Sequence, residues 1–252
     1  MSKTLCLIVC GAEGRMGRRV VALAQTDPRF RVAAGVVRGG RPASMFPFPL
    51  VGEGELPSYL PHADILVDFS IPAAGLRFAR TAARHRKPII VGTTGWTSRQ
   101  DASLRALSRR TPVFYSPNFS LAVNVLLQIA QEAAKRLPHY DLGITEVHHV
   151  LKKDAPSGTA LRLAELLRPY SPKPKIPIRS HRLGTIAGEH TLTLAGPFES
   201  LELTHRAESR DVFARGALET AWWLRGRRPG FYGMEHFLRT APSGSEEKRS
   251  PS

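Results

Sequence analysis

Residues Thr4 to Gly17 read Thr-Leu-Cys-Leu-Ile-Val-Cys-Gly-Ala-Glu-Gly-Arg-Met-Gly, and they give the first indication of the fold. Residues 4–9 are apolar and rich in strand formers, and a glycine-rich turn follows them. Beyond the turn, apolar residues recur at helical spacing at Met16, Val20, Leu23 and Ala24. A strand, a glycine turn and a helix in this order are typical of the first unit of a dinucleotide-binding sheet.

The three glycines of this turn have separate roles in such a unit. Gly11 permits the tight turn, Gly14 permits close approach of a pyrophosphate, and Gly17 permits close packing of the helix. Glu13 stands where the commoner fingerprint has a glycine. The motif alone is therefore equally compatible with a purely structural turn.

Strand and helix patterns alternate through the first half of the chain. Apolar strands are predicted at residues 30–37, 65–69, 88–91 and 112–115. Pro72 and Thr97 open the helices between them. This alternation predicts the α/β class, with a doubly wound parallel sheet forming a Rossmann domain. Ligands should bind at the carboxyl ends of its strands.

The second half of the chain has a different pattern. A long helix is predicted at 121–137, and residues 191–194 and 201–204 alternate like antiparallel strands with one solvated face. The prolines of residues 171–178 indicate a connecting loop. These patterns predict a second, α+β domain with an open mixed sheet. The helix at 212–225 is expected to return to the first domain.

Composition narrows the classes of function. The 252 residues are 42% hydrophobic, which suits a globular protein, and no apolar run is long enough to span a bilayer. The start of the chain lacks the pattern of a signal peptide, so we expect a cytoplasmic protein without a membrane partner. Cys6 and Cys10 provide neither a disulfide framework nor a plausible metal site.

The formal net charge of +15 raises the question of nucleic-acid binding. The arginines are scattered, without a basic block, a zinc-finger spacing or an aromatic-basic pattern. We therefore expect no nucleic-acid partner, and attribute the charge to solvated surface and to attraction for anionic ligands.

The chemistry is concentrated in residues 146–160, Glu-Val-His-His-Val-Leu-Lys-Lys-Asp-Ala-Pro-Ser-Gly-Thr-Ala, between a predicted strand and a predicted helix. His148 and His149 should point to opposite faces of the strand and have different tasks, one of them proton exchange near neutral pH. Lys152 or Lys153 adds a positive charge or a second proton.

Gly158 and Thr159 lie where the following helix begins, and the free amides of a first helical turn bind anions. Each of these elements has an ordinary structural interpretation, since such a turn is often only a helix cap. Their combination in one short span favours a pocket for an anionic small molecule, in particular a carboxylate.

The residues after the second predicted strand bear on the choice of cofactor. A site selective for NAD normally has an acidic residue there, yet the chain has none between Asp27 and Glu53. Arg38 and Arg41 follow the strand instead, and a guanidinium suits a 2′-phosphate. We predict that NADPH is preferred and that NADH is possible. The alternative is that both arginines are ordinary loop residues.

Several motifs, taken together, resemble those of one enzyme family. They are Gly11–Gly17, Val67-Asp-Phe-Ser-Ile-Pro72, Gly92-Thr-Thr-Gly95, Asn118-Phe-Ser120, Glu146–Ala160, Gly188-Glu-His-Thr191 and Thr204–Arg210. In their order and spacing the chain resembles the 4-hydroxy-tetrahydrodipicolinate reductase family, also called dihydrodipicolinate reductase. The resemblance covers nearly the whole chain except the tail. It implies hydride transfer from a nicotinamide cofactor to a cyclic dicarboxylate, with loss of water, in lysine biosynthesis through diaminopimelate.

The resemblance also implies roles for individual residues. His148 would donate or accept a proton, and Lys152 would be the second proton donor. The substrate carboxylates would be held by His149, Gly158 and Thr159. The cofactor would be contacted by Gly11, Ala12, Glu13, Gly14, Arg15, Met16, Arg38, Gly92, Thr93, Thr94, Ser116, Pro117, Asn118 and Phe119.

Domain organisation follows from the same resemblance together with the patterns above. We expect residues 1–120 and 211–240 to bind the dinucleotide, and residues 121–210 to bind the substrate and to form a homotetramer. The tail, residues 241–252, is expected to be disordered.

The chain departs from the family pattern at three places. Val37 occupies the position of the family's acidic residue, which argues against efficient use of NADH. Ala122 replaces a usual glycine, and the segment 175–188 is shorter than in many members.

Three other functions compete with this interpretation. One is another two-domain NADP-dependent oxidoreductase, and a second is a Rossmann-type cofactor-sensing regulator that binds nucleic acid. A third is a catalytically inactive relative that only binds ligands. The first two would not need the cluster at residues 146–160.

Overall fold

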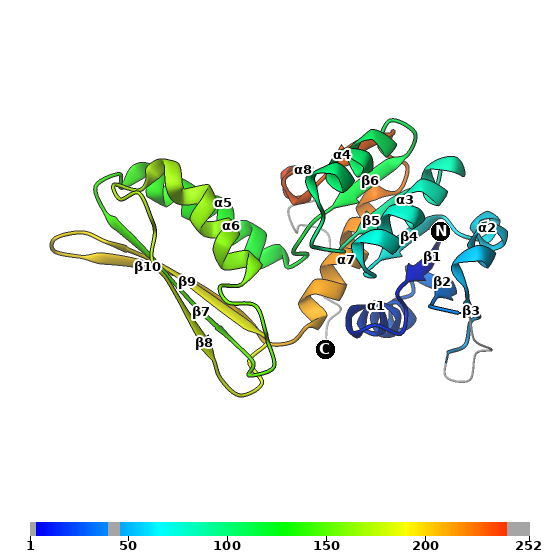
Figure 1. Cartoon of the computed structure of the whole chain (residues 1–252), viewed down its shortest axis with the longest axis horizontal. Coiled ribbons are helices and arrows are strands. Elements are labelled where there is room, and N and C mark those ends of the chain that lie inside the picture. The colour runs from blue at the N-terminus through cyan, green and yellow to red at the C-terminus, as the bar shows by residue number, and fades with distance from the viewer. Residues whose placement is uncertain (1–3, 40–45, 241–252) are drawn as a thin grey trace, which may run out of the picture.

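Two β-sheets organise the chain, the first with a buried core on each face and the second with a buried core on one face (Figure 1). The structure is a computed structural model and describes residues 4–39 and 46–240. The predictions for Arg41 and for the tail after residue 240 lie outside these residues. In the part that the structure describes, no helix has both the length and the apolar character needed to cross a bilayer.

The first sheet has seven strands, all parallel, in the order β11-β6-β5-β4-β1-β2-β3. Its strands are β1 (Leu5–Cys10), β2 (Phe30–Val36), β3 (Leu50–Val51), β4 (Ile65–Asp68), β5 (Ile89–Val91), β6 (Pro112–Tyr115) and β11 (Gly230–Tyr232). From β1 the chain first adds β2 and β3 on one side and then β4, β5, β6 and β11 on the other side. The sheet is therefore doubly wound, as predicted.

Helices cover both faces of this sheet. One face packs against α1 (Arg15–Thr26), α7 (Asp211–Leu224) and α8 (Met234–Thr240). The other packs against α2 (Leu56–Tyr59), α3 (Pro72–Arg84) and α4 (Ser98–Leu107). Single 3₁₀ turns, η1 (Glu53–Glu55), η2 (Leu60–His62) and η3 (Arg168–Tyr170), complete the connections. Side chains alternate along a strand and both faces of this sheet are covered, so β1 is apolar throughout. Leu7 and Val9 enter the core on one face, and Ile8 and Cys10 enter the core on the other.

The turn between β1 and α1 is as tight as its glycines predict. Gly11 has a φ of +78°, a conformation that favours glycine. A Cβ atom at Gly17 would lie 2.0 Å from the carbonyl oxygen of Gly11, so only glycine allows α1 to begin this close to the turn. The amino end of α1 is thereby held at the carboxyl end of β1.

The second sheet is mixed, with the order β10-β9-β7-β8. Its strands are β7 (Asp141–His148), β8 (Ile178–Arg182), β9 (Gly188–Ala195) and β10 (Ser200–Ala207). Only β7 and β8 pair in parallel. Helices α5 (Leu121–Arg136) and α6 (Gly158–Leu167) cover one face, and in Figure 1 the opposite face is open. The predicted fold class, a Rossmann domain plus an α+β domain with an open mixed sheet, is confirmed.

Candidate active site

A cavity of about 920 Å³ lies where the two parts of the chain meet. Its wall contains many of the residues singled out from the sequence: Arg15, Met16, Gly92, Thr94, Ser116, Pro117, Asn118, Phe119, His148, His149, Lys152, Gly158 and Thr159. A smaller hollow of about 250 Å³, at the amino ends of β1 and β4, contains none of them. The first cavity therefore combines the predicted dinucleotide and anion sites.

The other predicted cofactor residues lie outside this wall. Gly11, Ala12, Glu13 and Gly14 form the turn before α1, and Arg38 is exposed in the turn after β2. The side chain of Thr93 is buried and donates a hydrogen bond to Asp68 at 2.7 Å, so it supports the loop from below.

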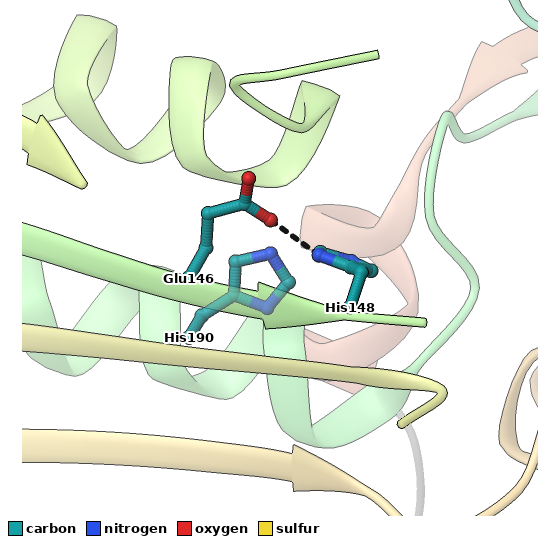
Figure 2. Close-up of side chains that lie close together, drawn as sticks. All are labelled: Glu146, His148 and His190. Atoms are coloured by element: carbon teal, nitrogen blue, oxygen red, sulfur yellow. Dashed lines mark ion pairs between the residues drawn. The ribbon is translucent and has the colours of Figure 1, made fainter. Parts of the chain in front are cut away.

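His148 ends β7 with its side chain buried. Residues along β7 alternate between buried and partly exposed, and Glu146 and His148 share the face that packs against the helices. Nδ1 of His148 is in ion-pair contact with the carboxylate of Glu146 (Figure 2). On the other side of the ring, a Cβ atom at Gly188 would lie 3.0 Å from Nε2. The imidazole is thus confined between a carboxylate and a bare backbone.

The surroundings of this histidine favour its neutral form. Burial lowers the pKa of His148, and the charge of Glu146 opposes this change only in part. His190, on β9, stacks edge-to-face on His148 with ring centroids 5.2 Å apart. Burial, and then the neighbouring His148, lower the pKa of His190 to about 4.

Glu146 is fully buried and paired with Arg182 of β8. Two guanidinium nitrogens of Arg182 donate to Oε1 of Glu146, each at 3.0 Å. Burial alone would raise the pKa of Glu146, but hydrogen bonds from Ser180 and Arg182 bring it below its usual range. Glu146 is therefore an anion near neutral pH.

Glu146, His148 and His190 also have the composition of a metal site, with candidate ligand atoms within 4.8 Å of one another (Figure 2). The guanidinium on the same carboxylate would repel a cation. We therefore interpret Glu146 and His190 as residues that hold the ring of His148 in its orientation.

Lys152 brings positive charge to the same cavity, and His149 brings a second imidazole. Nζ of Lys152 donates to both carboxylate oxygens of Asp154, at 2.8 and 2.7 Å, and this lowers the pKa of Asp154. His149 is only partly buried, and its Nε2 lies 3.0 Å from a guanidinium nitrogen of Arg210. His148 and His149 thus have different surroundings, as the strand alternation predicts.

The amino end of α6 closes the other side of the cavity. Ser157 caps the helix by accepting a hydrogen bond from the amide of Ala160 at 3.3 Å, and its hydroxyl lies 3.0 Å from Nε2 of His190. Asn118 donates to the hydroxyl of Thr159 at 3.1 Å, which joins the dinucleotide side to the anion side. The first-turn amides of α6 are left at the cavity wall, where an anion would find them.

Five residues of the site are absent from the sequence-based assignments: Glu146, Ser157, Arg182, His190 and Arg210. Glu146 could have been found, because it is two residues from His148 and so shares its face of the strand. Arg182 and His190 are more than 30 residues away from His148 in the sequence, and only the pairing of β8 and β9 with β7 brings them close. Arg210 is the N-cap of α7, outside the sheet, and reaches the site through its contact with His149.

The first part of the site fits a dinucleotide. The tight turn, the exposed Gly14 and the uncapped amino end of α1 leave backbone amides for a pyrophosphate. Gly92 matches this, since a Cβ atom there would strike the ring of Phe69 at 2.2 Å. Glycine therefore lets the backbone after β5 pack directly on the ring of Phe69, and both residues lie in the cavity wall.

Comparisons with known proteins agree over nearly the whole chain. The family model described as "Dihydrodipicolinate reductase, N-terminus" matches residues 5–119, and that described as "Dihydrodipicolinate reductase, C-terminus" matches residues 122–238. The 4-hydroxy-tetrahydrodipicolinate reductase of Aquifex aeolicus is 39% identical over 255 residues, covering 90% of this chain and 96% of its own. That of Caldanaerobacter subterraneus is 37% identical and covers 92% and 98%.

A solved structure has the same fold. The dipicolinate-bound dihydrodipicolinate reductase from Paenisporosarcina sp. TG-14 superposes with a TM-score of 0.81 at 22% identity, covering 94% of this chain and 100% of that one. The chain belongs to the dihydrodipicolinate reductase family, whose members are pyridine-nucleotide-dependent reductases.

Proposed function

We propose that this chain reduces 4-hydroxy-tetrahydrodipicolinate to tetrahydrodipicolinate, with NADPH as the preferred cofactor. One observation carries the proposal: a single cavity joins the end of a dinucleotide-binding sheet to a buried histidine, a lysine and the first residues of helix α6. The names of relatives with about 40% identity support the same reaction.

The two parts of the chain divide the work in this proposal. Residues 1–120 and 211–240 bind the dinucleotide, and residues 121–210 bind the substrate and form the contacts of a homotetramer. The turn Gly11–Met16 holds the pyrophosphate, and the segments 92–94 and 116–119 border the nicotinamide. When bound, NADPH supplies the hydride.

The substrate is a dianion, and the site opposes it with donors and positive charge. The amides of Gly158 and Thr159 bind one carboxylate together with His149. Arg210, which lies on His149, adds charge at the same place. An anion would also compete with Asp154 for the Nζ of Lys152.

Proton movements fall to the remaining groups. Loss of water carries a proton from a ring carbon to the departing hydroxyl, and reduction then adds one hydride and one proton. His148 is suited to accept a proton and to give it back, because burial lowers its pKa and keeps the ring neutral, while the charge of Glu146 stabilises the protonated form. Lys152 gives the second proton.

Preference for NADPH follows from the residues after β2. Val37 is buried and has no acceptor for a ribose hydroxyl, whereas the guanidinium of Arg38 is exposed beside it. A 2′-phosphate would pair with that guanidinium and would meet no nearby carboxylate in this segment.

The test is oxidation of NADPH, followed at 340 nm, with substrate generated by the preceding synthase and NADH run in parallel. We expect fast, substrate-dependent oxidation with NADPH and slower oxidation with NADH. The variant His148→Gln is the control, since it should bind NADPH but turn over about 10² to 10⁴ times more slowly. Absence of oxidation by the unmodified chain, with NADPH binding intact, would refute the proposed reaction.

A further inference from the structure

Arg182 is hydrogen-bonded both to the residue that contacts His148 and to the loop that carries Lys152. Besides Oε1 of Glu146, its guanidinium donates to two backbone carbonyl oxygens of the loop after β7. These are the carbonyl of Asp154, at 2.5 Å, and that of Lys152, at 3.3 Å from Nε. Its side chain is 20% exposed, and its bonds to Glu146 and to the Lys152 carbonyl are partly buried, whereas the bond to the Asp154 carbonyl is exposed.

The acceptors of these bonds are adjacent to the two groups that exchange protons in the proposed reaction, His148 and Lys152. Through Oε1, Arg182 fixes the carboxylate whose other oxygen contacts Nδ1 of His148. Through the loop carbonyls, it fixes the backbone that carries Lys152. The strand register supports the arrangement, because Arg182 is paired directly with His148 in the β7–β8 ladder.

We propose that Arg182 is a positioning residue that holds His148 and Lys152 in one geometry, through Glu146 on one side and the loop carbonyls on the other. This inference rests on the proposed function of the same site. It assigns to Arg182 and Glu146 no contact with substrate or cofactor. Neither residue is in the cavity wall, which agrees with an indirect role.

The number of bonds distinguishes this role from a simple ion pair. A planar guanidinium reaches several acceptors in fixed directions, whereas an ammonium on a flexible stem is a single point charge. Arg182→Lys should therefore keep the charge opposite Glu146 and lose the coupling to the loop. A residue that only neutralised a buried carboxylate would tolerate this change.

The experiment compares Arg182→Lys with Arg77→Lys. Arg77 is a matched control, because its guanidinium also bonds both a carboxylate, that of Glu53, and a backbone carbonyl, that of Ala73, away from the cavity. We expect Arg182→Lys to lower kcat by about 10²-fold while KM and the Kd for NADPH change by less than about threefold. Arg77→Lys should behave as the unmodified chain. An unchanged kcat in Arg182→Lys, or a loss confined to KM, would overturn the proposal.

A second measurement does not depend on turnover. The titration of the His148 ring is followed by NMR in the unmodified chain and in Glu146→Gln, which keeps the shape of the side chain and removes its charge. Because the charge of Glu146 raises the pKa of His148, the midpoint should move to lower pH in the variant. An unmoved midpoint would remove Glu146 from the arrangement, even if the unmodified chain did not turn over this substrate.

Two further results would also be informative: a variant that does not fold, and a requirement for a metal ion. If Arg182→Lys did not fold, the double variant Glu146→Gln with Arg182→Met would remove both charges together and keep the volume. The proposal then expects the same loss of kcat in a folded protein. If EDTA abolished the activity and Zn²⁺ restored it, Glu146 would be a metal ligand and the positioning role would be wrong.

Discussion

His190 illustrates how a buried histidine makes stability depend on pH. Its pKa is lowered to about 4, below the value of about 6.5 expected in an unfolded chain, so the fold favours the neutral ring. The resulting stabilisation is complete above pH of about 6.5 and is lost as the pH falls towards 4. The other buried histidine of the site, His148, acts in the same direction.

We predict that His190→Gln removes part of this dependence. Between pH 7 and pH 4 the unmodified chain should lose about 3 kcal/mol more unfolding free energy than the variant, as a shift of this size implies. Urea unfolding at the two pH values measures the difference. His139→Gln, at an exposed position after α5, is the control and should follow the unmodified chain. Equal losses in the unmodified chain and in His190→Gln would contradict this explanation.

Arg38 carries the second prediction at this scale. Replacement by alanine removes the guanidinium proposed to pair with the 2′-phosphate, and NADH has no such phosphate. Arg38→Ala should therefore weaken NADPH binding by about 10-fold or more, the effect of one or two charge-assisted hydrogen bonds, and change NADH binding little. Fluorescence titration with both cofactors measures this. Equal weakening of the two would show that Arg38 does not read the phosphate.

Residues close in sequence were the ones that the sequence could assign. His148, Lys152 and Gly158 lie within one short segment, so spacing alone predicts that they share a site. Arg182 lies in no motif that sets it apart from other polar strand residues. His190 lies in the motif Gly188-Glu-His-Thr191, but no local pattern places it beside His148. Their roles exist only because β8 and β9 pair on either side of β7.

At the scale of elements, the strongly patterned strands and helices were predicted and the weakly patterned ones were not. The long helices α1, α5 and α7 have apolar faces, and their predicted positions agree with the structure to within about three residues. Strand β8 is missed because residues 178–182, Ile-Arg-Ser-His-Arg, are mostly polar and follow a proline. The two or three residues of β3 and β11 are too short to show a period. These strands owe their conformation to the neighbours with which they pair.

Helix α7 provides a prediction at this scale. It supplies apolar residues to the first core, and it lies so close to the end of the segment after β6 that a Cβ atom at Gly216 would sit 1.8 Å from the carbonyl oxygen of Phe119. Gly216→Ala should lower the unfolding free energy by about 3 kcal/mol, at the upper end for an overpacked core. Gly54→Ala, where a Cβ atom meets nothing within 4 Å, is the control. Chemical denaturation of both variants tests this, and a stable Gly216→Ala would mean that the contact is looser.

For the whole molecule, the uncovered face of the second sheet bears on assembly. It is lined by polar side chains that bond to one another, such as Thr191 with Thr204 at 2.9 Å and Arg206 with Glu189 at 2.9 Å. Its side chains are nevertheless partly sheltered along β7 and β9. Such a face suits contact with a second copy of the chain.

We predict a mass near four times 27.7 kDa by light scattering coupled to gel filtration. Thr191→Glu would add a charge without a partner on this face, where Glu189 is already paired with Arg206, and burying that charge between two copies should be unfavourable and lower the mass. Ala102→Glu, at an exposed position of α4 on the first domain, is a control with the same change of one charge away from that face. A monomer in the unmodified chain would contradict the proposed tetramer.

The contact between Phe119 and Gly216 has a consequence for engineering. The chain leaves the dinucleotide part just after Phe119 and has returned to it by Gly216, so the two crossings lie side by side. The segment between them is therefore an insertion whose first and last residues lie next to each other on the dinucleotide part. A segment from another oxidoreductase with equally close ends could be grafted there without lengthening either connection. The Rossmann part of this chain is accordingly suited to chimeric enzymes that combine it with a different substrate-binding segment and so have a different substrate specificity.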